Sequence, residues 1–325
     1  MFLKEGYWAG LINGKLVTYI CPSRYCRCAT SEGLPGCKYN QSNPDLQCAN
    51  HRQGILCGQC SRGLNVGLRN FQCLKCDKSG WIFAVVVLVV ITLCVLVIWL
   101  NVGISNDLRG PLFVFQMLPY IFDPSENVER VVLFIGDMFN FGGPLVYFFH
   151  TCVINGMNNL YQVALGYLMP FVTLLVFAAF YVLSANYLIR LKFRRNSPLQ
   201  AFWLIVLFMY TYLVQTTFLI QNCPKLGNKF VFFYDGNIEC YQGQHLGMMV
   251  ISILVLVFLV IPPPVIVVLL TRGIWKVDPQ YVGTLTNGLR RGCLWWWAVD
   301  LGRRVLVAVT YVFIPSWNAK QVRSF

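Results

Sequence analysis

Cysteine is the residue type whose number and spacing first suggest chemistry in this chain. Nine cysteines lie between residues 21 and 76, in a stretch rich in glycine, proline and asparagine. That density is typical of small domains held together by disulfide bonds in place of a large apolar core. Because nine is odd, one cysteine is free or pairs outside this stretch. The disulfide candidates here are Cys21, Cys26, Cys28, Cys37, Cys48, Cys57, Cys60, Cys73 and Cys76.

A zinc ribbon is the alternative for the last four of these cysteines. Two residues separate Cys57 from Cys60 and also Cys73 from Cys76, a spacing that thiolate ligands of zinc use. We favour disulfides, because five more cysteines lie directly upstream and a very apolar segment follows closely. A sequon predicts N-glycosylation of Asn40, which agrees with a position outside the cell.

Three charged residues interrupt an apolar stretch near the C-terminus. Asp300 precedes Arg303 by three residues and Arg304 by four, so one carboxylate can pair with both guanidinium groups along a helix. A charge at the centre of a membrane helix costs about 2.5 to 3.5 kcal/mol, so we expect the arginines to face the interior of a bundle. The alternative is that they snorkel to headgroups beside the tryptophans at 295–297. The other polar residues expected within the membrane are Asp137 and Gln215.

Three successive prolines, Pro262, Pro263 and Pro264, interrupt another apolar stretch. None of them can donate a backbone hydrogen bond, and a proline disfavours helical geometry in the residue before it. We therefore predict a kink at this point, with Ile261 outside helical geometry.

Signals of catalysis are missing from the sequence. It contains no glycine-rich phosphate loop, no G-x-S-x-G and no H-E-x-x-H motif. The three histidines, His51, His150 and His245, are far apart and show no ligand spacing, so we interpret them as ordinary polar residues. We expect no enzymatic activity, no bound metal and no cofactor.

The composition indicates a membrane protein whose main partner is the lipid bilayer. Of 325 residues, 57% are hydrophobic and 12% are charged, whereas a soluble domain carries about 25% charge. The net charge of +13 does not predict nucleic-acid binding, because the basic residues lie between apolar stretches and orient them in the membrane. The N-terminus lacks the pattern of a signal peptide, so either the first span acts as its own signal or the chain is a fragment of a longer protein, and we favour the fragment.

Several apolar stretches have the length of a membrane-spanning helix. Residues 81–100 carry no charge and have a tryptophan near each end, which is typical of a span about 30 Å long with an aromatic belt. Residues 123–164 contain a Gly-Gly-Pro break and predict either a cap of short helices or a re-entrant segment. The predicted spans are 81–100, 104–122, 165–189, 199–221, 246–271 and 295–314. The fold class is therefore an all-α polytopic membrane bundle, residues 81–325, preceded by a disulfide-rich module, residues 1–80.

Charges in the loops predict the orientation of the bundle. Four basic residues between 190 and 195 place that loop in the cytoplasm. The loop 222–245 is then extracellular, where Cys223 and Cys240 could form a bridge and Cys152 is a further candidate partner. The same alternation places the N-terminal module outside the plasma membrane.

Part of the chain resembles a known family. The segment CANHRQGILCGQCSRGLNVGLRNFQCLKC, residues 48–76, followed by an apolar helix, resembles the membrane-proximal module of large, uncharacterised animal surface proteins. Three later segments recur there in the same order: FFHTCVINGM (148–157), FFYDGNIEC (232–240) and WWWAVDLGRRVLV (295–307). The resemblance implies a multi-span C-terminal region, distantly similar to transient-receptor-potential (TRP) channels, that usually follows a parallel β-helix-like ectodomain. It implies a receptor- or adhesion-like protein with an unidentified extracellular ligand; the alternative is a TRP-like cation channel or transporter.

Overall fold

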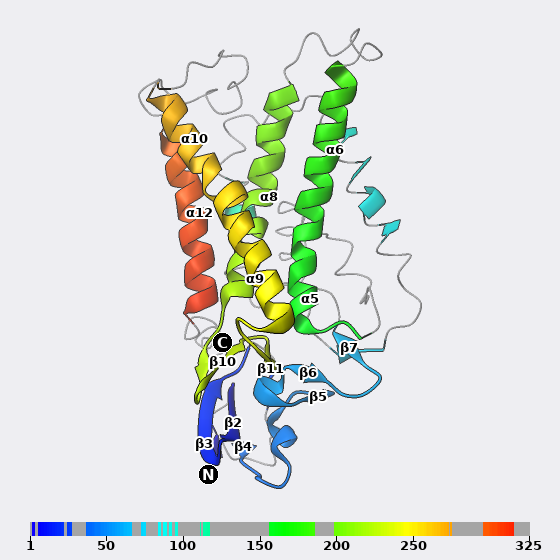
Figure 1. Cartoon of the computed structure of the whole chain (residues 1–325), viewed down its shortest axis with the longest axis vertical. Helices are drawn as coiled ribbons and strands as arrows, with labels where there is room; N and C mark the ends of the chain where they lie inside the picture. Colours follow the sequence, from blue (N-terminus) through cyan, green and yellow to red (C-terminus); the bar gives the residue numbers. More distant parts are fainter. Residues whose placement is uncertain are drawn as a thin grey trace.

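The computed structural model shows long helices side by side, with a small β-rich head at one end (Figure 1). The structure describes residues 2–3, 6–22, 25–27, 37–66, 73–75, 84–85, 87–89, 91–92, 95–96, 111, 113–117, 156–185, 198–272, 274 and 295–314.

The head consists of short antiparallel strand pairs. Its longest hairpin joins β2 (Tyr7–Ile12) to β3 (Lys15–Ile20) through a turn at Asn13 and Gly14. Both turn residues have positive φ, 52° and 73°, which is the geometry that favours an Asn-Gly pair in two-residue hairpins. The remaining pairs are β1 (Phe2–Leu3) with β4 (Cys37–Lys38), β5 (Arg52–Gln53) with β6 (Gln59–Cys60), and β7 (Asn65–Val66) with β8 (Cys73–Leu74). Two 3-10 turns, η1 (Pro44–Gln47) and η2 (Ile55–Cys57), connect them.

Disulfide bonds are present both in the head and in the segment that connects residues 221 and 243, the ends of two long helices. The bonds are Cys21–Cys26, Cys48–Cys57, Cys60–Cys73 and Cys223–Cys240. The prediction of a disulfide-bonded protein is thus confirmed at four pairs. The candidates Cys28, Cys76 and Cys152 lie outside the described residues, as does the side chain of Cys37.

The long helices run alternately away from the head and back towards it (Figure 1). The first rod is α5 (Asn159–Ala164), η3 (Leu165–Tyr167) and α6 (Leu168–Ala185) in succession. The returning helix α8 (Pro198–Gln221) contacts the rods on its sides, including α12 (Trp296–Phe313). The third rod is α9 (Gly243–Val255), the π-helical turn η4 (Leu256–Val260) and α10 (Pro262–Thr271).

A three-stranded antiparallel sheet lies between α8 and α9. Its strands are β9 (Lys225–Leu226), β10 (Lys229–Phe232) and β11 (Asp235–Glu239). The all-α fold class predicted for residues 81–325 is therefore wrong in excluding strands from the loop 222–245. The local sequence explains the difference, because a turn at Gly227 precedes a β-prone run of aromatic and branched residues.

A single apolar core joins the head to the helices. Trp8, Tyr25 and Leu56 of the head belong to the same cluster of buried side chains as Leu160 of α5 and Phe232 of β10. The small head thus packs its few large apolar residues against the bundle and the disulfides close the remainder.

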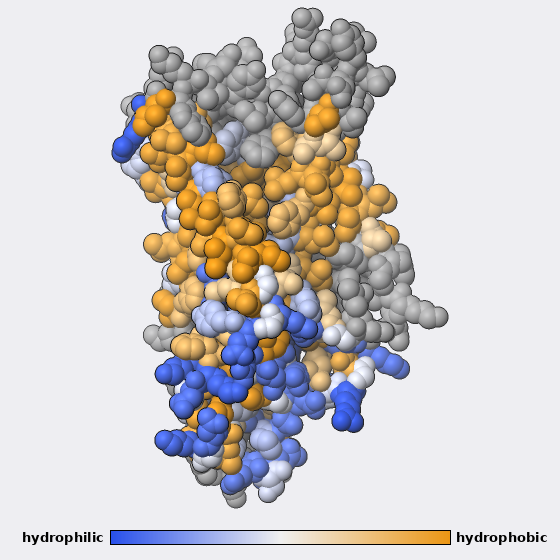
Figure 2. Space-filling view, viewed as in Figure 1, coloured by the Kyte–Doolittle hydropathy of each residue, from blue (hydrophilic) through white to orange (hydrophobic). Residues whose placement is uncertain are grey.

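Among the described residues, two helices are long and apolar enough to cross a membrane, rather than the six predicted. They are residues 159–179 and 243–270. In the most apolar part of residues 243–270, only 17% is buried. Three charges interrupt α12, and the described side chains of α8 form an apolar stretch over Ile205–Gln221. The predicted spans 81–100 and 104–122 lie mainly outside the described residues. In Figure 2, hydrophobic residues cover the helices and hydrophilic residues gather at the head.

The three prolines do not push the preceding residue out of the helix. Ile261 has φ −72° and ψ −42°, and its N–H donates to the carbonyl of Leu256, 2.9 Å away. The predicted disruption of Ile261 is therefore wrong, because a π-helical turn before Pro262 absorbs the change. Pro264 cannot donate to the carbonyl of Val260, and the hydroxyl of Tyr210 donates to it instead, at 2.9 Å.

Candidate functional site

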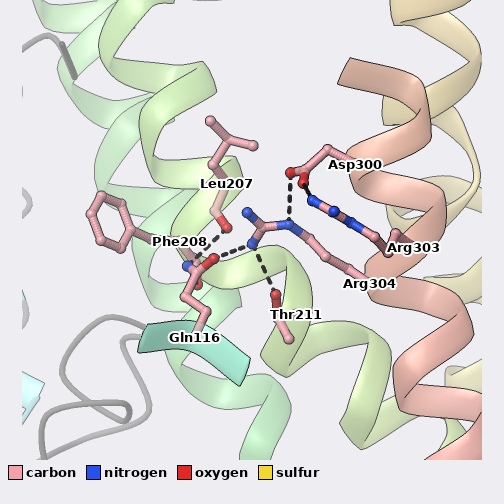
Figure 3. A network of polar contacts seen from close by, with 7 residues as sticks. All are labelled: Gln116, Leu207, Phe208, Thr211, Asp300, Arg303 and Arg304. Carbon is pink, nitrogen blue, oxygen red and sulfur yellow. Dashed lines mark hydrogen bonds and ion pairs between the residues drawn. The ribbon is translucent and has the colours of Figure 1, made fainter. Parts of the chain in front are cut away.

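Arg304 is the centre of a polar cluster between the helices, the Arg304 cluster (Figure 3). Its side chain projects from α12 and only 2% of the residue is exposed. Its Nε donates to Asp300 Oδ2 at 3.1 Å, and its Nη1 donates to Thr211 Oγ1 at 3.1 Å and to Gln116 Oε1. The buried charge therefore has a counter-ion one turn earlier and two neutral acceptors on other segments.

Gln116 connects this charge to the backbone of α8. It is fully buried, and its Nε2 donates to the carbonyls of Leu207 and Phe208, at 3.3 and 3.5 Å. Arg304 and Gln116 thus tie together α12, α8 and the helical residues 113–117. Our sequence reasoning missed Gln116; the available signal was one uncharged polar residue within the apolar run FVFQML.

Arg303 has a different environment from Arg304, although it binds the same carboxylate. Its side chain is 47% exposed, and its Nη2 donates to Asp300 Oδ1 at 2.6 Å. Its guanidinium carbon lies 4.0 Å from the centre of the Phe113 ring, within cation–π distance. The structure thus turns one arginine to the interior and leaves the other at the surface. Gln215 lies half-buried on α8, and Asp137 is outside the described residues.

A second polar centre, the junction, joins the head to the ends of the helices. Asn159, the first residue of α5, is fully buried, and its Nδ2 donates to the carbonyls of Gly58 in the head and Tyr234 in the β10–β11 turn. A side chain at Gly58 would place its Cβ 2.6 Å from the Asp235 Cα, and one at Gly236 would lie 2.5 Å from Ile55. Both backbones therefore approach so closely that only glycine fits.

Aromatic and charged residues surround the junction. The guanidinium of Arg52 stacks on Tyr25, with 3.5 Å between Cζ and the ring centre, and Tyr25 packs edge-on against Tyr234. Burial raises the pKa of Tyr25 to about 12. Burial also raises the pKa of the Asp235 carboxyl above its usual 3.8, although hydrogen bonds from Asn237 and the charge of Arg52 oppose the shift. The head thus contacts the helices through polar and charged groups whose burial costs free energy and whose mutual contacts offset that cost.

His245, which we interpreted as an ordinary polar residue, is fully buried beneath the Cys223–Cys240 bridge. Its Nε2 lies 3.1 Å from the carbonyl of Ile220, the last turn of α8, and must donate to it. Its Nδ1 then accepts the backbone N–H of Tyr241, at 3.3 Å. One neutral imidazole therefore connects the end of α8 to the start of α9.

Two groups of side chains in the described part of the chain have metal-ligand atoms close together. They are Cys21, Cys26 and Cys57, and Cys223, Cys240 and His245. All five cysteines are in disulfides, so they lack the thiolate that zinc binds.

The zinc-ribbon alternative meets the same difficulty. Cys57 is bonded to Cys48, and Cys60 to Cys73, while Cys76 lies outside the described residues.

Comparisons of the chain with protein-family models, curated protein sequences and solved structures find no match.

Proposed function

We propose that the chain is a multi-span, receptor- or adhesion-like protein of the plasma membrane, whose extracellular head passes the effect of ligand binding to its helices. The observation that carries this proposal is the junction. Asn159 of the first rod donates to the head and to the β10–β11 turn at once, and the surrounding apolar core is continuous. A head docked this closely cannot move without moving the ends of α5 and α8.

The distribution of apolar side chains supports a position in the membrane. Residues 243–270 are apolar and mostly unburied, which is the reverse of a core helix in a soluble protein. In this proposal α8 and α12 cross the bilayer as well, because they pack along the two apolar rods. The resemblance of residues 48–76 to a membrane-proximal module of animal surface proteins supports the same assignment.

The disulfides and the sequon support an extracellular head. Disulfides persist in oxidising compartments, and Asn40 is exposed on the head.

Expression in animal cells should give a glycosidase-sensitive increase in mass that Asn40→Gln abolishes. An epitope inserted between Asn13 and Gly14 should be accessible on intact cells, whereas one placed after Arg272 should require permeabilisation. The reverse pattern would reject the orientation.

The same head epitope tests the receptor-like coupling. An antibody against it acts as a surrogate ligand for the purified full chain. We expect its binding to slow amide hydrogen exchange at the start of α5 and the end of α8, and Asn159→Ala to abolish this remote effect without weakening antibody binding. Protection confined to the head would reject the proposal.

A cation channel or transporter is the second candidate, and the Arg304 cluster is the observation in its favour. Ionisable residues within membrane helices often mark ion pathways. Whole-cell current under voltage, stretch or calcium challenge, lost in the Asp300→Asn, Arg304→Gln double variant, would support this candidate. A silent wild-type protein at the cell surface would reject it.

A further inference from the structure

Exposed apolar side chains form a stripe along the third rod, through α9, η4 and α10. Its members recur every three or four residues and therefore share one helical face. The stripe runs from Leu246 to Val265, about 28 Å at 1.5 Å per residue, close to the thickness of the hydrocarbon core of a bilayer. The stripe consists of Leu246, Val250, Leu254, Val257, Phe258, Ile261 and Val265, each 47% exposed or more.

Two exposed aromatic residues lie next to the start of the third rod. Tyr241 is 48% exposed and Phe230 is 46% exposed, and their rings pack edge-to-face with 6.1 Å between centroids. The Tyr241 ring also lies 6.2 Å from the imidazole of His245, in the first turn of α9. Because His245 directly precedes Leu246, the first residue of the stripe, the aromatic pair lies close to the end of the third rod nearest the head.

An exposed ion pair adjoins the aromatic pair along strands β10 and β11. Lys229, the neighbour of Phe230, pairs with Glu239, and both side chains are exposed. From the third rod towards the sheet, the order along the chain is thus apolar stripe, Tyr241 of the aromatic pair and Glu239 of the exposed ion pair. That order matches hydrocarbon, headgroup boundary and water.

The backbone of Tyr241 is held in a conformation that tyrosine rarely adopts. Its φ is +64°, in the left-handed region where a glycine would be relaxed. Its N–H donates to His245 Nδ1, and its neighbour Cys240 is fixed by a disulfide. Strained backbone is concentrated at functional positions, so this conformation indicates a functional role for the exposed ring.

We propose that Phe230 and Tyr241 form an interfacial anchor, inserted at the headgroup–acyl boundary of the leaflet nearest the head. The partner is the phospholipid surface itself, and the anchor fixes the depth of the third rod and of the attached sheet. Aromatic rings suit this position, because they combine a large apolar face with a polar or polarisable edge. The inference rests on the membrane position proposed above.

Photocrosslinking in phosphatidylcholine proteoliposomes tests the anchor with the full chain. p-Benzoylphenylalanine replaces Phe230, which it resembles in shape, and the vesicles contain radiolabelled phosphatidylcholine. The matched controls carry the same residue at Leu46, which is 59% exposed on the head, and at Leu254 in the middle of the stripe. We expect the Phe230 and Leu254 variants to crosslink lipid at least about fivefold more than the Leu46 variant, as an interfacial aromatic should.

The controls separate the two ways in which the inference can fail. If the Leu254 variant crosslinks lipid and the Phe230 variant remains at the level of the Leu46 variant, the anchor is rejected and the membrane position stands. If neither the Leu254 nor the Phe230 variant crosslinks lipid, the proposed membrane position is rejected, and the anchor with it. A Tyr241→Gly variant, which relaxes the backbone and removes the ring, should lower crosslinking from position 230; unchanged crosslinking would show that Tyr241 is not part of the anchor.

Discussion

Arg303 and Arg304 permit a matched test of what burial does to an ion pair. Both are arginines of α12, both bind Asp300, and the same substitution to glutamine can be made in each. Arg303 is about half exposed, whereas Arg304 is almost completely buried. The comparison therefore varies the environment while the carboxylate stays the same.

The expected magnitudes differ several-fold. An exposed ion pair contributes about 0 to 1 kcal/mol, so Arg303→Gln should lower the free energy of unfolding by less than about 1 kcal/mol. Arg304→Gln removes the donor for three acceptors, and an orphaned buried polar group costs about 1 to 3 kcal/mol in soluble proteins. Hydrogen bonds between membrane helices average about 0.6 kcal/mol, because the unfolded chain also finds partners there. We expect a loss of about 2 to 4 kcal/mol for Arg304→Gln.

Reversible unfolding in mixed detergent micelles, followed by far-ultraviolet circular dichroism, measures this difference. Arg304→Lys is a further control, because it keeps the charge and loses the planar fork that reaches several acceptors; its loss should lie between those of the glutamine variants. Losses for Arg303→Gln and Arg304→Gln that agree within about 0.5 kcal/mol would refute the reasoning, since burial would then contribute nothing.

Three further predictions concern the junction and the proline segment. Asn159→Ala leaves two buried carbonyls without their donor and should destabilise the protein by about 2 to 4 kcal/mol. Asn158→Ala removes the cap of α5 and should cost about 1 kcal/mol. Equal losses of the two variants in chemical denaturation would contradict this prediction. Because burial raises the pKa of Asp235, the folded state binds the carboxyl proton more tightly than the unfolded state does. The contribution of this proton to the free energy of unfolding is therefore complete below about pH 3.8 and is lost as pH rises through the raised pKa. Asp235→Asn should flatten that part of the melting-temperature profile and raise the melting temperature at neutral pH, and an unchanged slope would show that another group titrates. Tyr210→Phe removes the hydroxyl that binds the carbonyl of Val260 and should cost about 1 kcal/mol in the same unfolding assay, without altering helix content.

The sequence was sufficient for features that depend on residue type and local spacing. Cysteine density predicted disulfides, and a pair of cysteines bracketing one loop predicted the Cys223–Cys240 bond that the structure contains. The Asp300, Arg303 and Arg304 spacing predicted a shared carboxylate, and both contacts are present. These predictions need only helical periodicity and chain proximity.

Features that depend on packing between distant segments could not be derived in this way. Gln116 and Thr211 are 188 and 93 residues from Arg304, and no periodicity connects them. The burial of His245 follows from the approach of α8 to α9, which the disulfide enforces. The proline rule failed at Ile261 because a π-helical turn and a hydroxyl from α8 offered the backbone an alternative that local rules do not include.

Two adjacent residues of α8 form hydrogen bonds with polar groups of two neighbouring rods. Tyr210 donates to the carbonyl of Val260 on the third rod, to which Pro264 cannot donate, and Thr211 accepts from the buried guanidinium of Arg304 on α12. Consecutive helix residues project about 100° apart, so one turn of α8 serves two neighbours at once. A rotation or shift of α8 would break both contacts together, since each depends on a hydrogen-bond distance near 3 Å. In the proposed coupling, a movement of the head would reach the buried charge through α8, because the far end of α8 leads directly into the bridge, the sheet and the junction.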